Sequence, residues 1–310
     1  MIKPLNGGSF FKYAMHLELT SRCTLACPAC PRTWFADKFN MPFPKQDLDL
    51  DTLSYFLDCN TGQTVDTLFL CGNHGDPIYY PRLFELIDRF RSTKKFIIVT
   101  NGSFQTPNFW NTLANKLTNN DSIVFSIDGL EHNNHLYRKN SNWQSLMTGL
   151  DIMLASNVPV TWKTLVFSYN QHEIQAIKEF AVGKGCSFSA MLSSRFSDDS
   201  FVPESQYVDS SRLYSKYESV ELTPRCQSQE YISADGYYWP CCMISSYFTL
   251  HKTVLWKQRN NWAIAGKKLD ALRPILSNWQ QGVINDPNNA HDVCKMECKS
   301  NQNTHTRLLT

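Results

Sequence analysis

Long apolar runs are missing from this chain of 310 residues. No uncharged stretch approaches the roughly 18 residues that a membrane-spanning helix needs. The first residues, Met-Ile-Lys-Pro-Leu-Asn-Gly-Gly, lack the apolar core of a signal peptide. The net charge of +2 gives no general attraction to nucleic acid or to an anionic membrane. We therefore expect a folded, cytoplasmic protein that binds no membrane, and the net charge does not favour nucleic acid as a partner.

Cysteine, in contrast, is abundant, with 11 residues. In the reducing cytoplasm this number favours metal or cluster binding over disulfide bonds. Three cysteines stand close together near the start of the chain, and five follow from residue 226 onward. The others, Cys59, Cys71 and Cys186, fall in apolar segments, where we expect them to behave as small core residues.

The early group is Cys23, Cys27 and Cys30, in a CX3CX2C pattern directly after an apolar segment that predicts a strand. Three thiolates at this spacing can hold three irons of a [4Fe–4S] cluster and leave the fourth iron without a protein ligand. That iron can bind and reduce a ligand, whereas a cluster held by four cysteines only passes electrons. A structural zinc site normally has four ligands, and no fourth candidate lies nearby. The pattern therefore favours a cluster-binding loop, with zinc as the alternative.

The first two thirds of the chain alternate strand-like and helix-like segments. Apolar residues three or four apart predict helices, for example within 83–90, 146–154 and 174–181. This alternation predicts an α/β fold with parallel strands and right-handed crossovers. The pattern alone permits either a partial (β/α)6 barrel or a doubly wound open sheet. The six predicted strands are 15–20, 65–71, 95–100, 122–127, 160–166 and 186–192.

The last third has a different composition. Residues 193–220 are rich in Ser, Asp and Tyr, which predicts a linker. Beyond it, Asp235-Gly236 lies between two β-rich segments and predicts a hairpin over 231–239. Apolar spacing over 269–279 predicts one more amphipathic helix. We therefore expect two domains, 1–200 and 201–310.

Polar residues follow several predicted strands. In both candidate folds, ligands bind where parallel strands end at their carboxyl edges. After the second strand, Gly72 and Gly75 would let backbone approach a ligand closely, and Asp76 could accept a hydrogen bond from an ammonium group. The neighbouring His74 could be catalytic, although a lone loop histidine more often only forms hydrogen bonds. Asn101 follows the third strand.

The fourth strand leads into Ser126-Ile-Asp128-Gly, with Arg138 ten residues after Asp128. A hydroxyl donor and a guanidinium group suit the binding of a carboxylate. Lys163 and Asn170 flank the end of the fifth strand and are candidates for contacts with a ligand. Taken alone, these segments are also compatible with a turn and surface charges.

The order of these segments after the cysteine loop resembles that in the radical S-adenosylmethionine (SAM) enzymes, and the matches span residues 16–298. The resemblance implies a partial (β/α)6 TIM-type barrel in domain 1–200, with SAM bound at the open iron. It also implies hydrogen abstraction by a 5′-deoxyadenosyl radical and a flavodoxin- or ferredoxin-type reductant. Asp76 stands where the family usually has Glu, and Ala29 where an aromatic residue is common. The implied SAM contacts are Gly72, Gly75, Asp76, Asn101, Ser126, Asp128, Arg138 and Lys163.

The later cysteines resemble a second family feature. Cys226 and Cys241 enclose Gly236 in a CX9GX4C pattern, which is similar to the start of SPASM and twitch domains. With Cys294 and Cys298, the resemblance implies an auxiliary [4Fe–4S] cluster in a small C-terminal α+β domain, 201–310. A full SPASM domain would need about three more cysteines, so the resemblance is to the single-cluster twitch subgroup. Cys242 is an alternative to Cys241, and zinc bound by four thiolates is an alternative to the cluster.

The substrate is the least defined part of this interpretation. The block from Ser126 to Arg138 is similar to that of relatives that modify peptides, which implies hydrogen abstraction from a peptide or protein side chain. The auxiliary cluster would assist oxidation or sulfur chemistry. The same chemistry on a small molecule, such as an aminocyclitol or a nucleotide, stays open, as does a non-catalytic iron–sulfur electron-transfer protein. A third interpretation, a zinc-stabilised RNA-binding module, is supported only by the basic segment 251–273 with Trp256 and Trp262.

Overall fold

The computed structural model describes residues 14–192, 201–204, 230–245, 258–286, 290 and 294. Each of the six predicted strands is present, and two of them have the predicted bounds. The strands of this part are β1 (Ala14–Leu17), β2 (Thr67–Leu70), β3 (Lys95–Thr100), β4 (Ser122–Ser126), β5 (Val160–Val166) and β6 (Ser187–Leu192). The helices are α1 (Pro31–Phe39), α2 (Leu50–Leu57), α3 (Asn60–Gln63), α4 (Leu83–Phe90), α5 (Pro107–Lys116), α6 (Asn134–Tyr137), α7 (Trp143–Leu154) and α8 (Ile174–Lys184), with 3-10 turns η1 (Pro77–Tyr79) and η2 (Gln171–Glu173).

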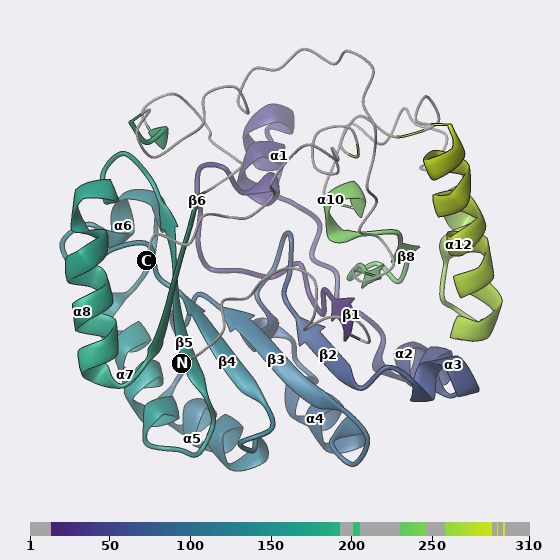
Figure 1. Ribbon diagram of the computed structural model, residues 1–310, viewed down its shortest axis with the longest axis horizontal. Helices are drawn as coiled ribbons and strands as arrows, with labels where there is room; N and C mark the ends of the chain where they lie inside the picture. Colours follow the sequence, from purple (N-terminus) through teal and green to yellow (C-terminus); the bar gives the residue numbers. More distant parts are fainter. Residues whose placement is uncertain are drawn as a thin grey trace.

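The strands form one eight-stranded sheet in the order β6-β5-β4-β3-β2-β1-β7-β8. Strands β1 to β6 are parallel to their neighbours, which confirms the predicted mixed α/β class. They follow one another across the sheet in chain order, without the reversal that defines a doubly wound sheet. Figure 1 shows the arrowheads of β2, β3 and β4 directed toward the side on which α1 and α10 (Cys242–Ser245) lie.

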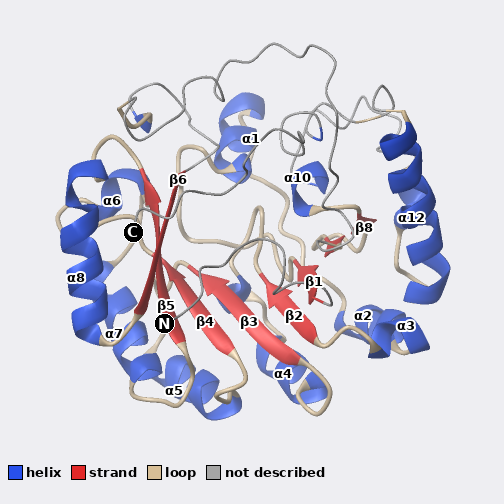
Figure 2. Cartoon of the chain, viewed as in Figure 1, coloured by secondary structure: helices blue, strands red, loops and turns tan. Residues whose placement is uncertain are grey.

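Helices pack against the outer side of this sheet through their apolar faces. α5 lies between α4 and α7, and α8 packs against β6 (Figure 2). The predicted apolar face of α4 is buried through Leu83, Leu86, Ile87 and Phe90. Burial of an apolar side chain of this size stabilises the folded protein by about 1.5–3 kcal/mol. The core therefore lies between the helices and the sheet and leaves the carboxyl ends of the strands to the loops.

The C-terminal part contributes to the same sheet. The predicted hairpin is present as β7 (Tyr231–Ile232) and β8 (Tyr238–Trp239), which pair antiparallel, and Gly236 has the positive φ of 81° that its turn requires. β7 pairs in parallel with β1, so that His16 lies beside Tyr231. The boundary predicted near residue 200 falls largely outside the described residues, and the division into two domains stays a prediction.

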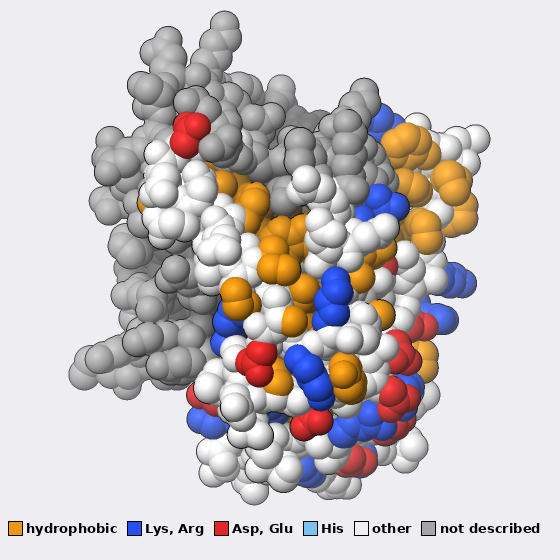
Figure 3. Space-filling view, turned by 90° about the vertical axis from the view of Figure 1, so that its right-hand side faces the viewer, with side chains coloured by type: hydrophobic (Ala, Val, Ile, Leu, Met, Phe, Trp, Pro, Cys, Tyr) orange, Lys and Arg blue, Asp and Glu red, His pale blue; other side chains and the backbone are white. Residues whose placement is uncertain are grey.

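The helix predicted over 269–279 is α12 (Leu269–Asn285), which packs against α3. Before it lies the 3-10 turn η6 (Arg259–Trp262), in which Trp262 is buried, as expected for a core tryptophan. Two of the basic side chains here have acidic partners: Arg273 donates two hydrogen bonds of 2.7 Å to Glu230, and Lys268 lies 3.1 Å from Asp58. Figure 3 shows basic and acidic side chains interspersed on the lower part of the face on this side. Among the helices described here, none is both long and apolar enough to cross a membrane.

Candidate functional site

The cysteine loop follows β1 and ends at the start of α1. Cys30 is the N-cap residue of this helix and Pro31 occupies the first helical turn, where a missing N–H group costs little. The Cys30 amide donates to the Cys27 carbonyl oxygen at 3.0 Å, which curls the end of the loop. All three thiols, including that of Cys23, are half-buried and form no disulfide. The structure thus confirms the predicted position of the loop, after the carboxyl end of β1.

Charged side chains surround these thiols. Burial raises the pKa of Cys23 to about 12, the nearby Asp76 carboxylate adds to this rise, and the Arg32 guanidinium opposes it. Burial likewise raises the pKa of Cys27 to about 11, and the Arg138 guanidinium opposes that rise. Without iron, both thiols are therefore protonated at neutral pH, and iron binding has to displace these protons.

The thiols lie within electrostatic range of one another, because Cys27 raises the pKa of Cys23 and Cys30 raises that of Cys27. In the part of the chain that the structure describes, no three or more His, Cys, Asp or Glu side chains converge to hold one metal ion. A [4Fe–4S] cluster has a different requirement, since each thiolate binds a separate iron. The three thiols therefore lie near one another, and their binding of a cluster or of zinc stays a prediction.

The base of the cysteine loop is fixed by residues 44–48. Ser21 Oγ donates to the Pro44 carbonyl oxygen at 2.8 Å and accepts from the Gln46 amide at 2.7 Å. Arg22 forms an ion pair with Asp47, with a shortest distance of 2.6 Å. These contacts hold the chain that leads into Cys23 without using any thiol.

The glycine-rich loop, residues 71–77, lies directly against the cysteine loop. A Cβ atom at Gly75 would lie 1.9 Å from the Thr20 carbonyl oxygen, and one at Gly72 would lie 2.2 Å from the Gly75 carbonyl oxygen. The Asp76 amide donates to the Arg22 carbonyl oxygen at 2.8 Å. The close approach that these glycines permit is thus between two backbone segments of the protein, and their contact with SAM stays a prediction.

Asp76 links the glycine-rich loop to the end of β3. Its Oδ2 accepts hydrogen bonds from Thr100 Oγ1 at 3.0 Å and from the Asn101 amide and Asn101 Nδ2 at 2.6 Å each. Burial raises the pKa of Asp76 to about 6, and these hydrogen bonds oppose the rise. Asn101 Nδ2 also lies 3.6 Å from Cys23 Sγ. Asp76 therefore orients a side chain that reaches the cysteine loop.

Asp128 and Arg138, both predicted to contact SAM, contact each other. Asp128 is fully buried, and its Oδ2 accepts from Arg138 Nε at 2.6 Å. Its Oδ1 accepts from the Leu165 amide at 2.8 Å. Burial alone would lower the pKa of Arg138, but the Asp128 carboxylate raises it. The Arg138 guanidinium lies near Cys27, so this ion pair belongs to the same site.

The remaining predicted residues stand on β4 and β5. Ser126 and Lys163 are neighbours in the register of these strands, and both are half-buried. The Lys163 ammonium group acts on the half-buried Cys71 thiol, lowering a pKa that burial raises to about 12. Asn170 is fully buried, and its Nδ2 donates to the Asp128 carbonyl oxygen at 2.7 Å. Asn170 therefore supports Asp128 from within the protein, and its contact with a ligand stays a prediction.

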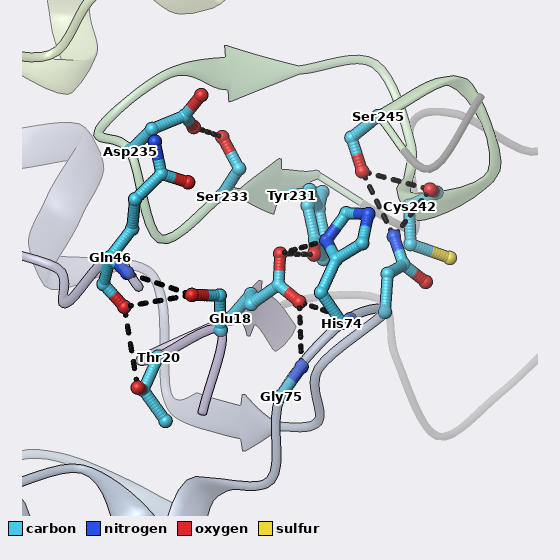
Figure 4. A network of polar contacts seen from close by, with 12 residues as sticks. Glu18, Thr20, Gln46, His74, Gly75, Tyr231, Ser233, Asp235, Cys242 and Ser245 are labelled. Atoms are coloured by element: carbon cyan, nitrogen blue, oxygen red, sulfur yellow. Dashed lines mark hydrogen bonds and ion pairs between the residues drawn. The ribbon is translucent and has the colours of Figure 1, made fainter. Parts of the chain in front are cut away.

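A buried carboxylate that the sequence reasoning missed is Glu18, just after β1. Its Oε1 accepts from the His74 amide at 2.6 Å, and its Oε2 accepts from Tyr231 OH at 2.7 Å and contacts His74 Nδ1 at 3.2 Å (Figure 4). Burial alone would raise the pKa of Glu18, but His74 and Tyr231 lower it to about 2. The signal for this residue was a strand in which His16, Glu18 and Thr20 alternate with apolar residues.

Only part of the predicted auxiliary site is described. Cys241 and Cys242 are half-buried at the start of α10, and Cys294 is buried. Cys226 and Cys298 lie outside the described residues. The four-cysteine cluster and the choice between Cys241 and Cys242 therefore stay predictions.

Comparison with known proteins gives a likeness of fold. No family model matches the chain, and no curated protein matches it in sequence. Streptococcus suis SuiB bound to S-adenosylmethionine has a TM-score of 0.56 at 14% identity, over 80% of this chain and 66% of SuiB. The anSMEcpe protein with bound AdoMet has a TM-score of 0.57 at 14% identity, over 84% of this chain and 80% of that one. SuiB bound to the precursor peptide SuiA has a TM-score of 0.53 at 12% identity, over 80% of this chain and 65% of SuiB.

The chain spans just under two thirds of the length of SuiB. At these identities the likeness concerns the fold alone. This chain thus has a mixed α/β fold similar to that of two proteins whose solved structures hold S-adenosylmethionine.

Proposed function

We propose that this chain is a radical SAM enzyme in which Cys23, Cys27 and Cys30 hold a [4Fe–4S] cluster and SAM binds beside it. The observation that carries the proposal is the position of these thiols. They stand in a CX3CX2C loop at the carboxyl end of β1, in a fold similar to that of SAM-bound proteins. The partial (β/α)6 barrel is part of the same proposal and is supported by six parallel strands in chain order.

The residues around the loop have separable roles in this proposal. When bound, the reduced cluster and SAM would supply a 5′-deoxyadenosyl radical that abstracts a hydrogen atom from the substrate. Arg138 gives one N–H group to Asp128 and keeps its other guanidinium donors for the SAM carboxylate. Ser126 and Lys163, neighbours across β4 and β5, would contact SAM from the sheet. Asp76 would act mainly by orienting Asn101, because its Oδ2 already accepts three hydrogen bonds.

A peptide or protein side chain is the proposed substrate. The likeness of fold to SuiB, which was solved with its precursor peptide SuiA, supports this choice. We further propose a twitch-type auxiliary [4Fe–4S] cluster at Cys226, Cys241, Cys294 and Cys298 in domain 201–310. A flavodoxin- or ferredoxin-type protein would supply the electrons.

The test is anaerobic reconstitution, followed by iron and sulfide analysis and an assay for 5′-deoxyadenosine formed from SAM and dithionite. We expect about eight irons per chain, since two cubane clusters hold four each. The Cys23/Cys27/Cys30→Ala variant should lose about half of this iron and all SAM cleavage. Cys186→Ala, a change at a buried cysteine directly before β6, is the matched control and should lose neither. Stoichiometric zinc in protein purified without oxygen, or no 5′-deoxyadenosine from the wild type, would contradict the proposal.

A further inference from the structure

The C-terminal hairpin contacts the glycine-rich loop through a buried carboxylate. Tyr231, the first residue of β7, is fully buried and donates to Glu18 Oε2 at 2.7 Å. The other oxygen of Glu18 accepts from the His74 amide at 2.6 Å and from the Gly75 amide at 3.4 Å. In Figure 4, dashed lines lead from the Glu18 carboxylate to Tyr231, to His74 and to Gly75. One carboxylate therefore joins a hydroxyl from residue 231 to two adjacent amides of the loop.

A second contact joins the same loop to the segment after β8. Asn73 Nδ2 donates to the Cys242 carbonyl oxygen at 2.7 Å and to Ser245 Oγ at 3.0 Å. Neither contact involves a thiol. The loop residues Asn73 to Gly75 are thus held from the C-terminal side, while Asp76 is held by the cysteine loop through the Arg22 carbonyl oxygen.

We propose that Tyr231 and Asn73 are positioning residues for SAM binding, which hold the glycine-rich loop at the distance from the cysteine loop that SAM requires. The inference rests on the proposed function, since it assigns the SAM site to these two loops. The physical reason is that a hydrogen bond to a buried carboxylate is strong and directional. Without the hydroxyl of Tyr231, the Glu18 carboxylate loses its side-chain contact with the hairpin, while the Glu18 amide still donates to the Ile232 carbonyl oxygen. Part of the order of the loop then has to come from SAM binding, at a cost in affinity.

The test uses the reconstituted full-length protein and three variants. Tyr231→Phe removes one hydroxyl and keeps the ring that packs against His16. Asn73→Ala removes the contact with α10 at a half-buried position. Tyr237→Phe is the matched control, because it makes the same change in the same hairpin at a hydroxyl with no hydrogen bond to the described residues.

Each of the first two variants should weaken SAM binding about tenfold, which corresponds to the loss of about 1.4 kcal/mol. KM for SAM should rise while kcat for SAM cleavage at saturation is kept. Hydrogen exchange of the His74 and Gly75 amides should be faster in iron-free Tyr231→Phe and unchanged in Tyr237→Phe. A purely structural role would lower the unfolding midpoint without this change of KM relative to kcat.

The outcomes separate the inference from the proposed function. If the wild type does not bind or cleave SAM, the proposed function itself fails. If the wild type binds SAM, and folded Tyr231→Phe and Asn73→Ala bind it equally well, only the positioning role is overturned. Should Tyr231→Phe not fold, Asn73→Ala decides the question by the same measurements.

Discussion

The ion pair between Asp128 and Arg138 gives the sharpest prediction for stability. Asp128 is fully buried and the Arg138 side chain is 15% exposed, so water reaches little of the pair. Arg138→Met removes the only donor to Asp128 Oδ2 among the described residues and leaves a carboxylate buried beside Leu165. Removing one partner of such a pair costs about 3–5 kcal/mol, because the remaining charge is desolvated without compensation.

Two further variants test this reasoning. Asp128→Asn combined with Arg138→Met removes both charges, and the amide oxygen can still accept from the Leu165 amide. The double variant leaves one buried polar group without a partner, at a cost of about 1–3 kcal/mol, so it should be more stable than Arg138→Met alone. Arg89→Met is the matched control, since Arg89 pairs with Asp51 at the surface, where an ion pair contributes about 0–1 kcal/mol.

The assay is urea unfolding followed by circular dichroism, on iron-free protein without SAM. In these conditions a contact between Arg138 and a ligand cannot contribute, so the measurement reports contacts within the protein. Equal losses of stability in Arg138→Met and Arg89→Met would refute the reasoning. So would a double variant less stable than Arg138→Met, because the buried charge would then not be the source of the cost.

Two other predictions concern the glycine-rich loop and strand β1. Gly75→Ala should destabilise the protein and lower iron content, because its Cβ would lie 1.9 Å from the Thr20 carbonyl oxygen, whereas Gly183→Ala in α8, with nothing within 4 Å, should stabilise it by about 0.5–1 kcal/mol. A tolerated Gly75→Ala, measured by thermal unfolding and iron analysis, would contradict the packing described. Burial lowers the pKa of His16 to about 4 from its usual 6.5, so the unfolded chain binds the proton first and stability is lost as pH falls from 6.5 to 4. In His16→Phe, the free energy of unfolding should fall by about 3 kcal/mol less than in the wild type between pH 6.5 and 4. Urea unfolding at several pH values measures this, and an equal fall in both proteins would contradict it.

The local sequence predicted the strands and the cysteine loop well, for a physical reason. Alternating or continuous apolar segments bounded by polar ones report burial directly, and β3 and β5 have the predicted bounds. The predicted loop positions then follow, because parallel strands end at one edge. The pairing of β7 with β1 could not be predicted in the same way, since it joins His16 to a residue more than 200 positions later. No local pattern encodes which sheet edge a short strand will cover.

Side-chain partners were harder to predict than elements. The sequence placed Asp128 and Arg138 in one motif and assigned both to a ligand, yet the carboxylate and the guanidinium meet each other. Asp76 likewise uses its Oδ2 for Thr100 and Asn101. A buried carboxylate must find donors in the folded chain before any ligand arrives, because leaving it without partners is costly. Residue types that suit a ligand therefore also suit one another, and only geometry separates the two uses.

Whether the cysteine loop keeps its shape without iron depends on the contacts that it makes within the protein. Small metal-binding domains often fold only when the metal is bound, because the ligands hold most of the structure. Here the base of the loop is held by Ser21, by the Arg22–Asp47 ion pair and by the packing of Gly75 on Thr20, and none of these contacts uses a thiol. Cys23/Cys27/Cys30→Ala should therefore keep the wild-type circular dichroism spectrum and an unfolding transition close to that of the iron-free wild type. If the variant unfolds while Cys186→Ala does not, the thiols themselves hold the loop, and its loss of SAM cleavage would no longer identify them as cluster ligands.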